Sequence, residues 1–197
     1  MLMSCNEKDI SLIGFMGCGK SSVGKILATL LPECRLIDLD TYIEEKQGKN
    51  IPEIFNEYGE AAFRRMEREA LEEIFSDKSR PRAILSLGGG TVTSGQCRQL
   101  IRRHTDCFYL RATTTTLLSN LEGHSEGRPM LNPTQPVEAS STEVPSEREA
   151  LRHRIESLMK TRSPQYLATA HHIIDIDGLS FAQIAEAVEG NILNIKQ

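Results

Sequence analysis

The segment GFMGCGKS at residues 14–21 places glycines, a lysine and a serine in the spacing G-x-x-x-x-G-K-S. It follows an apolar run at 10–15 and precedes residues with helical spacing, which is the strand, loop and helix context of a phosphate-binding loop. In such a loop, backbone N–H groups and the positive end of the helix dipole hold phosphate oxygens. We therefore expect Lys20 to reach the β- and γ-phosphates of a nucleotide and the Ser21 hydroxyl to bind Mg²⁺. The alternative is a glycine-rich turn with an exposed lysine.

Asp38 and Asp40 lie at the carboxyl end of a second apolar run, at 35–39. Because they alternate on one predicted strand, both should point to the same side of it, at the edge where parallel α/β sheets bind ligands. In a phosphotransferase, one carboxylate helps to hold Mg²⁺ and the next orients or deprotonates the acceptor hydroxyl. A carboxylate that only caps a helix from Thr41 onward is the other interpretation.

Three glycines, Gly88 to Gly90, end a third apolar run at 82–87. Glycine loses much conformational freedom on folding, so three in succession indicate a sharp bend or a close approach of the backbone to another group. We expect this backbone to approach a substrate, and a tight structural turn is the alternative.

Strand and helix patterns alternate along the whole chain. Apolar runs at 10–15, 35–39, 82–87, 106–110 and 171–176 predict strands, and helical periodicity occurs at 21–31, 61–75, 113–121, 147–167 and 181–193. The stretch 42–58 predicts a helical segment interrupted at Gly48 and Pro52. In 61–75 the apolar residues share one helix face, and the charged residues are expected on the other. This alternation predicts a three-layer α/β/α fold around a central parallel sheet of about five strands.

We expect a single domain over residues 1–197, since this length suits one compact unit. An inserted substrate-binding region is expected at about 40–65. Residues 122–146 are rich in Gly, Pro, Ser, Thr and Glu and have little apolar periodicity, which indicates an exposed loop. The loop is interpreted as a lid, with an inert insertion as the alternative.

Composition restricts the partners. A net charge of -4 gives no general attraction to a polyanion, so nucleic acid is not expected as a partner. The five cysteines are scattered without CxxC or metal-ligand spacing, which indicates free thiols in a reducing compartment. The five histidines show no ligand spacing either. No apolar run suits a signal peptide or a membrane span, so we expect a cytoplasmic protein. We also expect a monomer.

Five motifs in order resemble the shikimate kinase family, and the resemblance covers almost the whole chain apart from the loop after Arg128. They are GFMGCGKSS, LIDLDTYIEEKQGKNIPEIFNEYGEAAFRRMERE, LSLGGGTV, GRPML and RSPQY. The phosphate loop alone is shared by many families, whereas the D-x-D, FRR and GGG motifs together are far more specific. The resemblance implies a P-loop nucleotide kinase-like fold and ATP-dependent phosphorylation of the 3-hydroxyl of shikimate, with Mg²⁺, in aromatic amino-acid biosynthesis.

The resemblance also implies roles for individual residues. Asp38 resembles the carboxylate that reaches the metal through water, and Arg128 resembles the lid arginine that closes on the phosphates. Lys20, Asp40 and Arg128 are the implied catalytic residues. Shikimate is implied to bind to Asp40, Arg64, Gly89 and Arg162, with the two arginines on its carboxylate. The implied ATP-binding residues are Gly17, Cys18, Gly19, Lys20, Ser21, Ser22 and Arg128.

The chain departs from the family pattern in three places. The segment between Arg128 and Arg162 is longer than usual, and its stretch 132–146 has no role assigned by the residues. No basic adenine-contact motif occurs near 177–180. Cys18 within the phosphate loop is either oxidisable or a small residue that fits there. Two other functions stay open: a kinase for another small hydroxy acid such as gluconate, which should lack the Arg64, Gly89 and Arg162 site, and a non-catalytic nucleotide-binding module.

Overall fold

The computed structural model describes residues 8–122 and 146–195, and the sequence-predicted lid therefore lies almost wholly outside the described residues. Five parallel strands form one sheet in the order β2-β3-β1-β4-β5. The strands are β1 (Asp9–Ile13), β2 (Arg35–Asp38), β3 (Ala83–Ser86), β4 (Thr105–Arg111) and β5 (His172–Asp175). The helices are α1 (Lys20–Leu30), α2 (Leu39–Gln47), α3 (Ile51–Ser76), α4 (Gly95–His104), α5 (Thr114–Leu121), α6 (Glu147–Thr169) and α7 (Phe181–Ile195), with a 3-10 turn, η1, at Thr91–Thr93.

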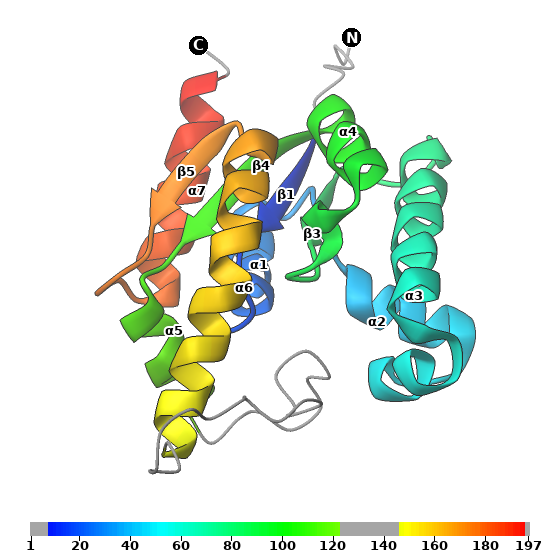
Figure 1. The fold of residues 1–197 in the computed structure, drawn as a ribbon. Coiled ribbons are helices and arrows are strands. Elements are labelled where there is room, and N and C mark those ends of the chain that lie inside the picture. The colour runs from blue at the N-terminus through cyan, green and yellow to red at the C-terminus, as the bar shows by residue number, and fades with distance from the viewer. Residues whose placement is uncertain (1–7, 123–145, 196–197) are drawn as a thin grey trace, which may run out of the picture.

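Helices cover both faces of the sheet. Helices α1 and α7 pack together on one face, and α4 and α6 lie on the other, with α3 beside α4 (Figure 1). Alternation along β1 explains the layering, because Ile10 and Leu12 point into the core beneath α1 and α7, whereas Ile13 joins the core beneath α3 and α4. The predicted three-layer fold around a parallel sheet is confirmed.

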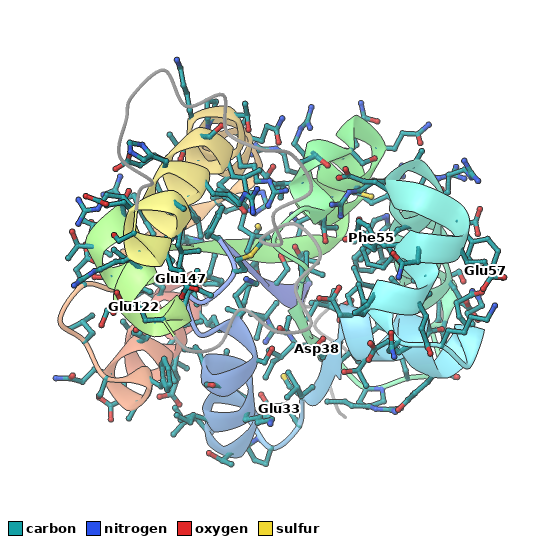
Figure 2. The ribbon with its side chains drawn as sticks, turned by 60° about the horizontal axis from the view of Figure 1, so that its bottom comes forward. Glu33, Asp38, Phe55, Glu57, Glu122 and Glu147 are labelled. Atoms are coloured by element: carbon teal, nitrogen blue, oxygen red, sulfur yellow. The ribbon has the colours of Figure 1, made fainter. Side chains whose placement is uncertain are left out.

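The position of β1 explains where ligands can bind. It lies between β3 and β4, and the chain leaves it toward β2 on one side and later returns to β4 on the other. Ligands of open α/β sheets bind at such a switch point, beyond the carboxyl ends of the strands. That edge lies at the bottom of Figure 1 and faces the viewer in Figure 2.

The region between β2 and β3 is a pair of helices, but the expected interruption at Pro52 is wrong. Gly48 ends α2 in the left-handed conformation, with φ of 64°. Asn50 then caps α3 in a capping box with Glu53, and Pro52 lies in the first helical turn. Proline is favourable there because the first turn lacks acceptors for its N–H groups, so Pro52 begins a helix and does not break one.

Candidate functional site

The phosphate loop joins β1 to α1, as its spacing predicts. Gly19 is the N-terminal cap of α1 with φ of 85°, a conformation that side chains rarely adopt. The Lys20 side chain is nearly buried, and its Nζ donates to the carbonyl oxygens of Gly14 and Phe15 at 2.9 and 3.0 Å. The loop thus presents the N-terminus of α1 beside a lysine that its own backbone carbonyls hold in place.

A hydroxyl and a carboxylate meet at the start of α1. Ser21 Oγ donates to Asp38 Oδ2 at 2.7 Å and lies 3.1 Å from Ser86 Oγ. Sequence reasoning missed Ser86, which is buried at the end of β3 and pairs in register with Asp38 of β2. Figure 2 labels Asp38 where β2 meets α2. These oxygens are the type of group that Mg²⁺ prefers.

Asp40 does not lie on a strand with Asp38, and that expectation is corrected. Asp38 Oδ1 accepts from the backbone N–H groups of Asp40 and Thr41 at 3.2 and 3.4 Å, so it caps α2 and the chain becomes helical at Leu39. The capping interpretation therefore holds together with the contact to Ser21. Asp40 lies in the first turn of α2, and a Cβ placed on Gly88 would be 2.9 Å from its Oδ1.

Asp40 is a much weaker acid than an ordinary aspartate. Burial, and then the negative charges of Glu67 and Asp38, raise its pKa from 3.8 to about 7, against the opposing effect of Lys20 and Arg64. A carboxyl group with such a pKa can gain or lose a proton near neutral pH, which suits a general base.

Arg64 is held by carboxylates on two sides. Its Nη1 donates to Glu67 Oε2 at 2.6 Å, and its Nε and Nη2 donate to Glu60 Oε1 at 3.3 and 2.9 Å. Glu67 has no exposed surface, and its Oε1 accepts from Thr91 Oγ1 at 2.5 Å. Burial raises the pKa of Glu67, and Arg64 and Thr91 act against that rise.

The expectation that all charges of α3 lie opposite its apolar face is wrong at Glu67. This residue is four positions after Phe63 and three before Ala70, so it lies on the buried face. That spacing was the available signal for its role. The glycines after β3 make room for this cluster, because a Cβ on Gly90 would lie 2.2 Å from Arg64 Nη2. Gly88 and Gly90 thus approach side chains of the protein itself, and the approach of this backbone to a substrate stays a prediction.

Arg162 is a buried cation. Its residue is 3% exposed, and its Nη1 has no hydrogen-bond partner among the described residues. Burial, and to a smaller extent the charge of Arg64, lower its pKa. The guanidinium carbon lies 5.9 Å from the centroid of the Phe15 ring in the phosphate loop. The α6 helix therefore brings an incompletely paired positive charge next to the end of β1.

Comparison with known proteins identifies the family of this chain. The family model for shikimate kinase matches residues 16–192. The chain belongs to the shikimate kinase family. A shikimate kinase of Chlorobaculum tepidum is 40% identical over 158 residues, covering 80% of this chain and 76% of the relative. One from Thermus thermophilus is 35% identical, covering 91% and 86%.

A solved structure gives the same result. The shikimate kinase from Acinetobacter baumannii, in complex with shikimate, matches with a TM-score of 0.79 at 31% identity, covering 96% of this chain and 95% of that one. The sequence resemblance to this family and the P-loop kinase fold are therefore confirmed.

Most of the site residues that the sequence motifs implied lie together at one edge of the sheet in this family member. Lys20 and Arg64 both lie close enough to Asp40 to lower its pKa, and Arg64 does the same to Arg162. A Cβ on Gly89 would lie 3.1 Å from the Met16 backbone nitrogen in the phosphate loop. The loop residues Gly17, Cys18 and Ser22 adjoin them in sequence. Arg128 lies outside the described residues.

A pocket that sequence reasoning missed lies beside the phosphate loop of this family member. It has a volume of about 390 Å³ and is lined by α5, the turn after β5 and the start of α7. Phe181 is 44% exposed, and a Cβ on Gly19 would be 2.5 Å from its ring. On the opposite side, Asn120 Nδ2 donates to the Gly17 carbonyl at 2.9 Å. The signal in the sequence that could have indicated this pocket was Phe181, an aromatic residue soon after the last strand. It lies where the basic adenine-contact motif is missing.

Within residues 8–122 and 146–195, no group of three or more His, Cys, Asp or Glu side chains is arranged to hold a metal ion. No helix in the same ranges is long and apolar enough to cross a membrane. Cys18, Cys97 and Cys107 are buried free thiols.

Proposed function

We propose that this chain transfers the γ-phosphoryl group of ATP to the 3-hydroxyl of shikimate, giving shikimate 3-phosphate and ADP. The observation that carries the proposal is the buried guanidinium group of Arg162, whose Nη1 has no hydrogen-bond partner in the described part of the chain. A buried cation with an unpaired donor is costly unless an anion binds it. Shikimate, which the Acinetobacter relative binds, carries a carboxylate and ring hydroxyls.

Arg64 is suited to bind the carboxylate together with Arg162. Glu67 holds its Nη1 from the buried side, whereas Glu60 occupies the Nε and Nη2 edge. The Glu60 side chain is 48% exposed, so this ion pair contributes little stability. A substrate carboxylate can replace Glu60 at that edge, where two parallel N–H groups offer a bidentate contact.

Asp40 is the proposed general base. The 3-hydroxyl oxygen forms a bond to the γ-phosphorus while the bond from that phosphorus to the bridging oxygen breaks, and the electron pair of the broken bond stays on ADP. The hydroxyl proton passes to a carboxylate oxygen of Asp40. A pKa of about 7 makes this carboxyl group a better base at neutral pH than an ordinary aspartate.

The phosphates and Mg²⁺ are proposed to bind at the start of α1. Ser21 and Asp38 fit Mg²⁺, Ser21 as a direct ligand and Asp38 through water, because this ion keeps several waters and takes few protein ligands beside nucleotide phosphates. When bound, the ion neutralises negative charge on the phosphates. Lys20 exchanges its carbonyl contacts for phosphate oxygens, and Arg128 is proposed to close on them from the lid, which excludes water.

We propose the pocket at Phe181 as the adenine site. Phe181→Ala is expected to weaken ATP binding roughly five- to hundredfold, because stacking of a base on an aromatic ring is lost. Isothermal titration calorimetry with ATP checks this. Inorganic tripolyphosphate, which lacks a base, is the control ligand, and its affinity should stay unchanged. Equal losses for both ligands contradict the stacking role and indicate that Phe181 only supports Gly19.

The activity is tested by ADP release with Mg-ATP and shikimate, beside gluconate and a sample without acceptor. Release that depends on shikimate alone supports the proposal. Turnover with gluconate favours the alternative kinase, and the absence of acceptor-dependent turnover favours a nucleotide-binding module. The single domain, the monomeric state and the cytoplasmic location stay predictions from the sequence.

A further inference from the structure

Tyr166 of α6 joins two parts of the site that are far apart in the sequence. Its side chain has no exposed surface, and its hydroxyl donates to the carbonyl oxygen of Gly89 at 2.5 Å, across 77 positions of sequence. This bond connects the helix that carries Arg162 to the glycine turn after β3. The proposed mechanism does not use Tyr166.

The ring of Tyr166 is fixed independently of that bond. It stacks on Tyr109 of β4, with 5.0 Å between the ring centroids and 25° between the ring planes. Tyr109 is 2% exposed, so the two rings form part of the core beneath α6. The hydroxyl at the tip of a ring held in this way has little freedom, so it sets the position of its acceptor.

On one side, the bond orients the glycine turn. The carbonyl of Gly89 and the N–H of Gly90 belong to one peptide plane, so fixing the first fixes the second. Gly90 in turn packs against Arg64, since a Cβ there would lie 2.2 Å from Arg64 Nη2. Rotation of this peptide would therefore disturb the surface on which the Arg64 guanidinium rests.

On the other side, Tyr166 is linked to Arg162. The two residues are four positions apart on α6, which places their side chains on the same helix face. Burial lowers the pKa of Arg162, whereas the interaction of its guanidinium group with the Tyr166 side chain raises that pKa. One side chain thus contacts both Arg162 and the turn that supports Arg64.

We propose that Tyr166 is a positioning residue for the acceptor carboxylate. Its hydroxyl holds the peptide between Gly89 and Gly90 at a set distance from α6, so that Arg64 and Arg162 bind one carboxylate from two sides. The inference rests on the proposed function, because it assumes that shikimate binds between these arginines. A purely structural hydroxyl would contribute to stability and leave substrate affinity alone.

Tyr166→Phe keeps the stacked ring and removes only the hydroxyl. Loss of one positioning hydrogen bond is expected to raise both the Kd and the KM for shikimate roughly three- to tenfold, while the KM for ATP stays within about twofold. Tyr109→Phe is the matched control, because it removes the hydroxyl of the other ring in the stacked pair, which interacts with Ser163. Calorimetry, steady-state kinetics and thermal unfolding are measured on both variants.

The outcomes separate the two proposals. If the wild type turns over shikimate and Tyr166→Phe changes only the Tm, as Tyr109→Phe does, the positioning role is rejected and the proposed function stands. A wild type without shikimate binding or turnover rejects both. Combining Tyr166→Phe with Arg162→Met gives a further check, since a positioning role predicts that the two losses in shikimate affinity are clearly less than additive. Additive losses count against it.

Discussion

Asp40→Asn is expected to lower the kcat of phosphoryl transfer by about 10²- to 10⁴-fold and, at pH 8, to make the folded protein more stable. The amide keeps the shape of the side chain but cannot accept the proton of the acceptor hydroxyl. Substrate affinity should change much less than kcat, because Arg64 and Arg162 still bind the carboxylate. If Asp40→Asn loses stability at pH 8 as well as kcat, the assignment of Asp40 as the base is contradicted.

The gain in stability follows from the sign of the pKa shift. The folded state binds the Asp40 proton more tightly than the unfolded state, since burial, Glu67 and Asp38 raise the pKa from 3.8 to about 7. Below pH 3.8 the carboxyl group is neutral in both states and costs nothing. Between these values the cost of the charge grows with pH, and above pH 7 it is complete, at up to about 4 kcal/mol. Asparagine avoids this cost.

Unfolding in denaturant at pH 5 and at pH 8 measures the effect. The free energy of unfolding of Asp40→Asn should exceed that of the wild type by about 2–4 kcal/mol at pH 8 and by less at pH 5. Asp175→Asn is the matched control, because its hydrogen bond to Arg111 lowers the pKa of Asp175 and the amide should then reduce stability. In the wild type, kcat/KM for shikimate should rise with pH up to about 7, as Asp40 loses its proton.

Arg162→Met is expected to raise the KM for shikimate by about 30- to 5000-fold and to leave the KM for ATP nearly unchanged. Removing one partner of a buried, hydrogen-bonded charge pair costs about 2–5 kcal/mol of binding free energy. The ligand-free protein should become no less stable, because methionine fills much of the same volume and removes a buried charge whose Nη1 has no partner in the described part of the chain. The substitution thus weakens substrate binding without lowering the stability of the ligand-free protein.

Arg152→Met is the control for this variant, since it removes an exposed arginine from the same helix. Its KM values and Tm should match those of the wild type. Calorimetry with shikimate and thermal unfolding without ligand distinguish the two roles of Arg162. If Arg162→Met binds shikimate normally but unfolds at a lower temperature, the arginine is a packing residue and the carboxylate site lies elsewhere.

Short-range patterns were enough to predict most of the elements and the phosphate loop. Apolar runs and helical spacing predicted all five strands of the sheet and the strand, loop and helix unit around residues 14–21. Such patterns are reliable because burial on one face repeats every two or 3.6 residues within a single element. The family motifs added the site residues, of which Arg128 lies outside the described residues.

Contacts between elements could not be predicted in this way. The pairing of Asp38 with Ser86 follows from the register of β2 against β3, and the bond from Tyr166 to Gly89 follows from where α6 crosses the sheet. The alternation of Asp38 and Asp40 predicts one strand, because the cap by which Asp38 begins α2 is not visible in that pattern. The position of Glu67 on the buried face of α3 was likewise not predicted from the sequence.

The sequence by itself therefore determined the order of strands and helices and the chemical types that gather at the carboxyl ends of the strands. Only the tertiary structure decided which of these groups are buried and paired. It left the Nη1 of Arg162 without a hydrogen-bond partner among residues 8–122 and 146–195, and it raised the pKa of Asp40 to about 7. The reason is physical: burial and charge act through distances between segments far apart in the chain, and local spacing does not encode those distances.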